Sequence, residues 1–231
     1  MNVALVAIGI KEALNKLDSS DYDNFECWQI RNAFNKVQRE WSRRQIIGAN
    51  QQQAGDEETS FKVDDLQILL SPPKFLKGKN YDLYFESDLI PEDYFFMKRV
   101  TPYVKTSCGI TNFSSKEREE GNVDDYLADW ATQPAPEMQE TFHTMSGNRI
   151  RVYTNGEFKV DKIKLTYYRL PREIDFTGCE HIDGSSGTNV DPEFKDDIVD
   201  ILIDEAASKL AGDIESINQI EITKQRSNIN T

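Results

Sequence analysis

The stretch Arg149-Ile150-Arg151-Val152-Tyr153-Thr154-Asn155-Gly156-Glu157-Phe158-Lys159-Val160 alternates its side chains on both sides of a turn, as β-strands do. Asn-Gly tolerates the positive φ values that tight hairpins require. Ile163, Leu165 and Tyr167 continue the alternation before Pro171 ends it. The sequence therefore predicts a three-stranded antiparallel arrangement, buried on one face, in this part of the chain.

A helix is predicted on the C-terminal side of these strands. Asp191-Pro192-Glu193 supplies an N-cap residue, a proline in the first turn and an acid near the positive end of the helix dipole. Its apolar stripe follows helical spacing and consists of Phe194, Ile198, Ile201, Leu202, Ala206 and Leu210.

Two further helices are predicted on the N-terminal side. The first spans about residues 3–17, and the second runs from about Asp21 to Ile46. The apolar residues of the second step by three and four, as in a coiled-coil seam: Cys27, Ile30, Phe34, Val37 and Trp41. We expect the two helices to pack against each other as an αα-hairpin.

These elements predict an α+β fold. N- and C-terminal helices form a helical body, and the centre of the chain is an antiparallel strand-rich insertion. The expected division is 1–60 with 190–220 for the helical body, 61–189 for the insertion and 221–231 for a flexible tail. A chain of 231 residues is long enough to bury a sizeable core.

The composition is acidic, with 27 Lys and Arg against 40 Asp and Glu and a formal net charge of −13. Such a surface repels phosphate, which argues against sequence-specific nucleic-acid binding as the main activity. Only 38% of the residues are hydrophobic, so part of the chain is expected to be loop or interface that partners order. The 12 Phe, 9 Tyr and 3 Trp residues are sufficient to anchor a core.

The three cysteines, Cys27, Cys108 and Cys179, are widely spaced and form no CxxC pair. This pattern predicts neither a disulfide framework nor a zinc knuckle, and it favours a reducing compartment. Residues 1–10 are apolar but lack the basic region of a signal peptide, and no stretch approaches the ~20 apolar residues that cross a bilayer. We expect a soluble, unprocessed chain without membrane contact.

The sequence carries no motif for nucleotide binding, for a serine nucleophile or for a zinc protease. Cys179 and His181 stand two residues apart near Asp183, but a second ligand pair is missing, so a plain loop is favoured over a metal site. His143 is expected to be a hydrogen-bonded structural histidine, because no nucleophile is adjacent in sequence. We therefore expect no catalytic residues, metal or cofactor.

Charge is distributed unevenly between two predicted helices. Residues 31–46 carry a net charge of +4, and residues 191–216 carry −7. Three interpretations stay open: the helices pair within one monomer, they pair between neighbouring copies in a head-to-tail contact, or Arg39, Arg43 and Arg44 contact nucleic acid.

The chain resembles the head-to-tail connector (ring or adaptor) proteins of tailed bacteriophages, most closely those of crAss-like phages, from about Ile10 to Gln219. The stretches that carry the resemblance are Phe34-Asn35-Lys36, Trp41-Ser42-Arg43-Arg44-Gln45, Glu140-Thr141-Phe142-His143, Gly147-Asn148-Arg149-Ile150-Arg151-Val152-Tyr153, Tyr167-Tyr168-Arg169-Leu170-Pro171, Val190-Asp191-Pro192-Glu193-Phe194-Lys195-Asp196-Asp197-Ile198-Val199 and Ala211-Gly212-Asp213-Ile214-Glu215-Ser216. The strand-rich centre departs from the small all-helical adaptors of other tailed phages.

The resemblance implies a structural virion protein at the portal vertex, assembled in the host cytoplasm. About twelve identical subunits would form a closed ring between the portal protein and another connector or tail protein. Genomic DNA would pass through the lumen without sequence-specific binding. A tail-completion or assembly factor is the alternative function, and a metal-dependent phage enzyme is a weaker one.

The resemblance also implies roles for individual residues. Expected packing residues are Phe34 and Val37, from the spacing of the predicted seam, and, from the resemblance, Phe194, Ile198, Leu202 and Leu210. Expected interface residues are Trp41, Arg43 and Arg44 at a subunit or portal contact, Arg149 and Arg151 facing a neighbour or the lumen, and Asp196 and Asp197.

Overall fold

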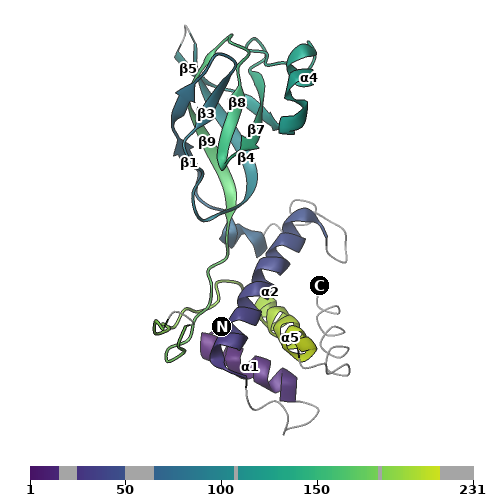
Figure 1. Ribbon diagram of the computed structural model, residues 1–231, viewed down its shortest axis with the longest axis vertical. Helices are drawn as coiled ribbons and strands as arrows, with labels where there is room; N and C mark the ends of the chain where they lie inside the picture. The colour runs from purple at the N-terminus through teal and green to yellow at the C-terminus, as the bar shows by residue number, and fades with distance from the viewer. Residues whose placement is uncertain (16–24, 50–64, 107–108, 182–183, 214–231) are drawn as a thin grey trace. The chain divides into compact units, whose positions relative to one another are not determined.

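The computed structural model describes residues 1–15, 25–49, 65–106, 109–181 and 184–213 (Figure 1). The predicted tail at 221–231, Cys108 and Asp183 lie outside these ranges. The chain divides into two compact units: Met1–Leu69 with Pro171–Thr231, and Leu70–Leu170. We name them the helical unit and the β unit.

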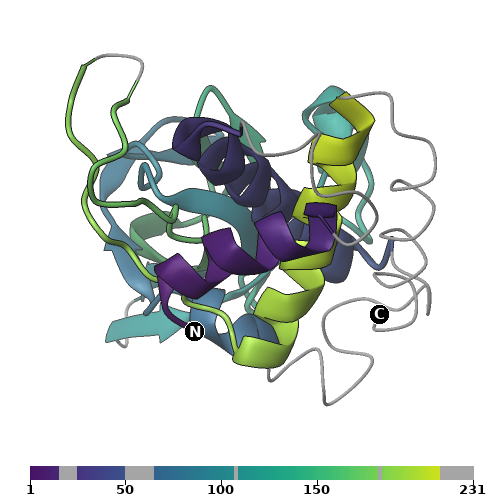
Figure 2. The ribbon, with the colours of Figure 1, turned by 90° about the horizontal axis from the view of Figure 1, so that it is seen from below.

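The helical unit contains α1 (Val3–Asn15), α2 (Cys27–Ile47) and α5 (Asp196–Asp213). Helices α1 and α2 each pack mainly on α5, and not mainly on each other as the predicted αα-hairpin requires (Figure 2). The predicted seam of α2 is buried from Ile30 to Trp41, and the Trp41 ring meets Phe194 edge to face at 5.3 Å. Helix α5 therefore provides the surface on which the other two helices bury their apolar faces.

Helix α5 begins at Asp196, five residues after the predicted start. The carboxylate of Asp191, expected to cap α5, instead accepts a hydrogen bond of 2.8 Å from the Val3 backbone N–H. Val3 is the first residue of α1, so Asp191 satisfies an otherwise unpaired amide at the positive end of that helix. Asp191 therefore does cap a helix, as predicted, but the helix that it caps is α1, almost 190 residues away in sequence.

The β unit contains two sheets. The first has the strand order β1-β9-β4-β5, with bounds β1 Lys74–Leu76, β9 Lys159–Arg169, β4 Tyr94–Thr106 and β5 Gly109–Asn112. The second has the order β2-β3-β8-β7-β6, with bounds β2 Gly78–Asn80, β3 Tyr84–Ser87, β8 Arg149–Tyr153, β7 Glu140–Ser146 and β6 Ser114–Glu117. Apolar residues of both sheets, among them Phe85 and Val152 of one and Val100 and Leu165 of the other, form a single buried cluster. The sheets therefore pack face to face around one core.

The predicted hairpin at 149–160 is wrong in its pairing. Asn155 and Gly156 do adopt positive φ values, 50° and 76°. However, β8 pairs with β3 and β7, whereas β9 pairs with β1 and β4 in the other sheet. The Asn-Gly turn therefore carries the chain from one sheet to the other. The hairpin of this region is β7–β8, which turns at Gly147 and Asn148, both also at positive φ.

The predicted fold class is also corrected. The described residues form an α+β structure with four α-helices and nine strands, but the helices are not confined to the chain ends and the central strands are not all antiparallel. Strands β6 and β7 are parallel. Because a parallel pair needs a crossover connection, the chain between them forms η2 (Glu120–Asn122) and α4 (Val123–Ala128) inside the strand-rich segment. A second 3-10 helix, η1, spans Gln67–Leu69.

Candidate functional site

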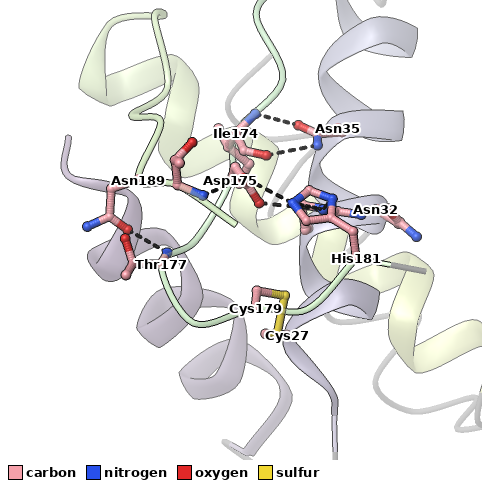
Figure 3. A network of polar contacts seen from close by, with 11 residues as sticks. Cys27, Asn32, Asn35, Ile174, Asp175, Thr177, Cys179, His181 and Asn189 are labelled. Atoms are coloured by element: carbon pink, nitrogen blue, oxygen red, sulfur yellow. Dashed lines mark hydrogen bonds and ion pairs between the residues drawn. A yellow bond between two sulfur atoms is a disulfide. The ribbon is translucent and has the colours of Figure 1, made fainter. Parts of the chain in front are cut away.

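A disulfide joins Cys27, at the start of α2, to Cys179 in the loop that leads towards α5 (Figure 3). This finding overturns the prediction that the cysteines form no disulfide. The two residues are 152 positions apart, and a separation of that size does not predict which cysteines pair. Cys179 is fully buried, and its sulfur is committed to the disulfide and is available neither as a nucleophile nor as a metal ligand.

Polar side chains of α2 hold the chain just before this loop (Figure 3). The buried Asn35 side chain donates to the Ile174 carbonyl at 3.1 Å and accepts from the Ile174 N–H at 2.8 Å. Gln38, also buried, donates to the Arg172 carbonyl at 2.8 Å. These contacts satisfy backbone groups that would otherwise be buried without partners, so they determine where the segment lies on α2.

A second polar group ties the loop itself to α2. The Arg31 guanidinium contacts the His181 ring and lies 3.4 Å from the Asp175 carboxylate, and His181 lies 3.2 Å from the other Asp175 oxygen. Burial acts to raise the pKa of Asp175, but backbone N–H groups of Thr188 and Phe176 and the neighbouring His181 outweigh it, and the pKa lies below its usual value. Asp175 is therefore an anion that orders the loop. We name the disulfide and these polar contacts the α2 clamp.

The α2 clamp contains Cys179 and His181, which the sequence singled out as possible metal ligands; Asp183 lies outside the described residues. Cys179 is in the disulfide and His181 is engaged by Arg31 and Asp175. Within the described ranges, no group of three or more His, Cys, Asp and Glu side chains is arranged to hold a metal ion. What the arrangement does is position a loop on a helix.

His143 lies on β7 in the β unit and is almost completely buried. Its Nδ1 is 2.7 Å from the Ser115 hydroxyl of β6, and no described residue hydrogen-bonds its Nε2. Burial lowers the pKa of His143 to about 4, so the ring is neutral near pH 7. A serine does lie beside this histidine, although the sequence placed none there. In a catalytic triad a carboxylate hydrogen-bonds the histidine ring and orients it. No described carboxylate hydrogen-bonds the His143 ring.

The oppositely charged helices α2 and α5 pair within one chain. The Arg44 guanidinium contacts both carboxylate oxygens of Glu205, at 2.6 and 2.5 Å, and Lys209 forms an ion pair with Glu40. Of the three interpretations left open by the charge pattern, these contacts match pairing inside the monomer.

The six predicted packing residues are all buried in the helical unit: Phe34, Val37, Phe194, Ile198, Leu202 and Leu210. The predicted interface residues have varied surroundings. Trp41 is only 3% exposed, whereas Arg43, Asp196 and Asp197 are exposed, and Asp196 contacts the N-terminal amine.

The two predicted interface arginines of β8 have partners inside the β unit. Arg149 donates to the Ser87 carbonyl at 2.9 Å. Arg151 bridges Glu86 and Glu120 at 3.0 and 2.7 Å. Both side chains remain partly exposed, so they border the surface while they also hold neighbouring strands together.

Exposed apolar side chains are the surface feature that sequence reasoning missed. In the helical unit, Leu5 and Ile8 of α1 are 55% and 51% exposed, although the opposite face of α1 is buried. In the β unit, Trp130 and Met138 on the β6–β7 crossover are 85% and 76% exposed. The signal for α1 was present in residues 1–10, which are apolar almost all round the helix, a composition typical of buried helices.

A pocket of about 380 Å³ lies between α2 and α5. Its lining combines apolar groups with two ammonium groups: Phe25, Trp28, Gln29, Asn32, Ala33, Lys36, Lys209 and Leu210. We name it the α2–α5 pocket. Its apolar groups suit an apolar ligand group, and its two ammonium groups suit carboxylates beside that group.

Throughout the described ranges, no helix combines the length and the apolar character that crossing a bilayer requires. A scan of the chain against models of known protein families found no match, and a search of curated proteins found none either.

Proposed function

We propose that this chain is a structural subunit of a phage virion, which forms a closed ring at the portal vertex and links the portal to the tail. The proposal starts from the resemblance of its sequence to phage connector proteins. Identical subunits, the portal protein and another connector or tail protein would be its partners, and genomic DNA would pass through the lumen.

The observation that carries this proposal is the presence of large exposed apolar side chains on both units of the same chain. Leu5 and Ile8 lie on the helical unit, and Trp130 and Met138 lie on the β unit. Leu5 and Ile8 stand three positions apart on one helix face and so form an adjacent apolar pair, and tryptophan and methionine are enriched at protein–protein interfaces. A subunit with two different contact surfaces can join identical neighbours head to tail, which is the geometry of a ring.

The α2 clamp supports a structural role as well. A ring subunit must present its surfaces in a constant geometry while it bears load. The disulfide and the Asn35 and Asp175 contacts restrain a long loop on α2, which reduces the number of conformations available to it. The net charge of −13 suits a lumen past which DNA must slide, because like charges keep phosphate from adhering to the wall.

The test is the mass of the purified chain, alone and with its portal protein, measured by native mass spectrometry. A closed oligomer of one defined copy number, or one that forms on the portal, is the expected result. A chain that stays monomeric alone and ignores the portal would overturn the proposal. Mass spectrometry of mature virions then separates a permanent connector from an assembly factor, since only the connector is retained in the particle.

A further inference from the structure

Trp130 is the most exposed large apolar side chain of the described part of the protein. It follows α4 directly, on a turn that is internally hydrogen-bonded: the Asp129 side chain accepts from the Ala131 N–H at 3.0 Å, and the Asp129 carbonyl accepts from the Thr132 N–H at 3.0 Å. An aromatic side chain on an ordered turn loses little conformational freedom when it binds. Trp130 is thus presented to solvent in a form ready for association.

The residues around Trp130 are acidic. Asp124, Asp125 and Asp129 are all exposed on the same short segment, which contains no basic residue between Gly121 and Trp130. We name residues 123–130 the tryptophan segment. It exposes the Trp130 ring beside three carboxylates, while its partly buried Tyr126 ring is covered by the Arg118 guanidinium.

The α2–α5 pocket has the complementary chemistry. Phe25, Trp28 and Leu210 supply apolar lining, and Lys36 and Lys209 supply positive charge. Lys209 is engaged by Glu40, whereas Lys36 is an exposed residue of the pocket wall. The volume of about 380 Å³ lies in the range of pockets that enclose a small ligand or a large side chain.

We infer that Trp130 of one subunit inserts into the α2–α5 pocket of the next identical subunit, with its acidic neighbours facing Lys36 and Lys209. This inference rests on the proposed ring and names the contact that closes it. Donor and acceptor are different surfaces of one chain, so the contact is heterologous and repeats from copy to copy.

The contact is one anchor in a larger interface. A buried tryptophan removes roughly 150–250 Å² from water, well below the ~1,200 Å² of a stable interface. The outer face of α1, with Leu5 and Ile8, is available to contribute further area. Tryptophan is enriched among the few residues that dominate binding energy, so loss of Trp130 is expected to weaken association disproportionately.

The experiment uses two variants of the full chain, each defective on one side of the contact. Trp130→Ala removes the donor, and the double variant Asn32→Glu/Lys36→Glu places two carboxylates at exposed positions of the pocket wall, one in place of a neutral amide and one in place of an ammonium group. Ile110→Ala, at an exposed apolar residue of β5 in the same unit, is the matched control. Circular dichroism and thermal unfolding verify that each variant is folded.

Sedimentation velocity of each defective variant alone is expected to show self-association at least about 30-fold weaker than wild type, whereas that of Ile110→Ala is expected to be unchanged. The 1:1 mixture of the two defective variants is expected to form a dimer and stop there. In the mixture, the intact Trp130 of the pocket variant meets the intact pocket of Trp130→Ala, and no second contact can form.

Three other outcomes overturn the inference, and they do so in two distinguishable ways. If wild type forms an oligomer and Trp130→Ala forms the same one, or if the mixture stays monomeric, the named contact is wrong and the proposed ring stands. If wild type is monomeric alone and with its portal, the proposed function fails and the inference fails with it.

Discussion

Cys27 and Cys179 illustrate how single residues couple distant parts of the helical unit. They lie 152 positions apart, and their disulfide closes a loop that includes the whole β unit. Cross-linking a long loop removes many conformations from the unfolded chain. Nearby, Asn35 and Asp175 add hydrogen bonds that determine where the loop rests.

Replacement of Cys179 by Ser is expected to lower the free energy of unfolding by about 2–4 kcal/mol, because the unfolded chain regains those conformations. Urea unfolding with and without reductant measures this effect, and Cys108→Ser is the control. Thiol titration of the denatured, unreduced protein should find one free thiol, since two of the three cysteines are paired. Three free thiols would contradict the disulfide.

His143 makes stability depend on pH. Its pKa is about 4 in the folded chain against 6.5 ordinarily, so between these values the unfolded chain binds a proton that the folded chain does not. The contribution of His143 to stability is therefore fully present above pH 6.5, and it is expected to fall by about 2–3 kcal/mol as the pH drops towards 4.5. Chemical unfolding from pH 7 to 4.5 should show a shallower dependence for His143→Gln. Identical slopes for both proteins would exclude this role.

At the scale of elements, α5 organises the helical unit by accepting α1 on one side and α2 on another. Its contact with α2 combines apolar packing, such as that of Trp41 on Phe194 next to α5, with the ion pairs Arg44–Glu205 and Lys209–Glu40. The Arg44 side chain is 42% exposed while that of Glu205 is 12% exposed, so solvent screens this pair only in part.

Reversal of Arg44 to Glu places two carboxylates together, and we expect a loss of about 1 kcal/mol in the free energy of unfolding, as for a partly exposed pair. The swapped double variant Arg44→Glu/Glu205→Arg is expected to recover most of it. Urea unfolding of the wild type, both single variants and the double variant gives the coupling energy. A coupling energy of zero would show that the pair does not stabilise the packing of α2 on α5.

At the scale of the whole molecule, large apolar side chains are exposed on both units. Helix α1 buries one face and exposes Leu5 and Ile8 on the other, and the β unit exposes Trp130. In the proposed ring, neighbouring subunits cover these groups. Assembly would then bury apolar groups that the single chain leaves in contact with solvent.

The double variant Leu5→Ser/Ile8→Ser is expected to weaken ring assembly at least tenfold while the subunit stays folded, because exposed substitutions seldom change stability by more than about 0.5 kcal/mol. Mass photometry across a concentration series measures assembly, and thermal unfolding measures the fold. Lys11→Ser, at an exposed polar position of the same helix, is the control. Wild-type oligomers from the double variant would exclude this face of α1 from the subunit contact.

Local chemistry determined a definite part of this structure. The spacing of Ile30, Phe34, Val37 and Trp41 is enough to specify a helix with one buried face, and Asn155-Gly156 is enough to specify a turn at positive φ. Both features depend on residues within a few positions of one another, which is why the sequence alone predicts them.

Tertiary structure decided which elements meet. That β8 and β9 enter different sheets, that Asp191 caps α1 and not α5, and that Cys27 meets Cys179 each depend on groups brought together across long stretches of chain. The alternation of side chains predicts that a strand needs neighbours, and a capping residue predicts that it binds a helix N-terminus. Neither pattern predicts which strand or which helix that partner is. That choice is made by the packing of the complete core, where every buried apolar face and backbone group must be satisfied at once.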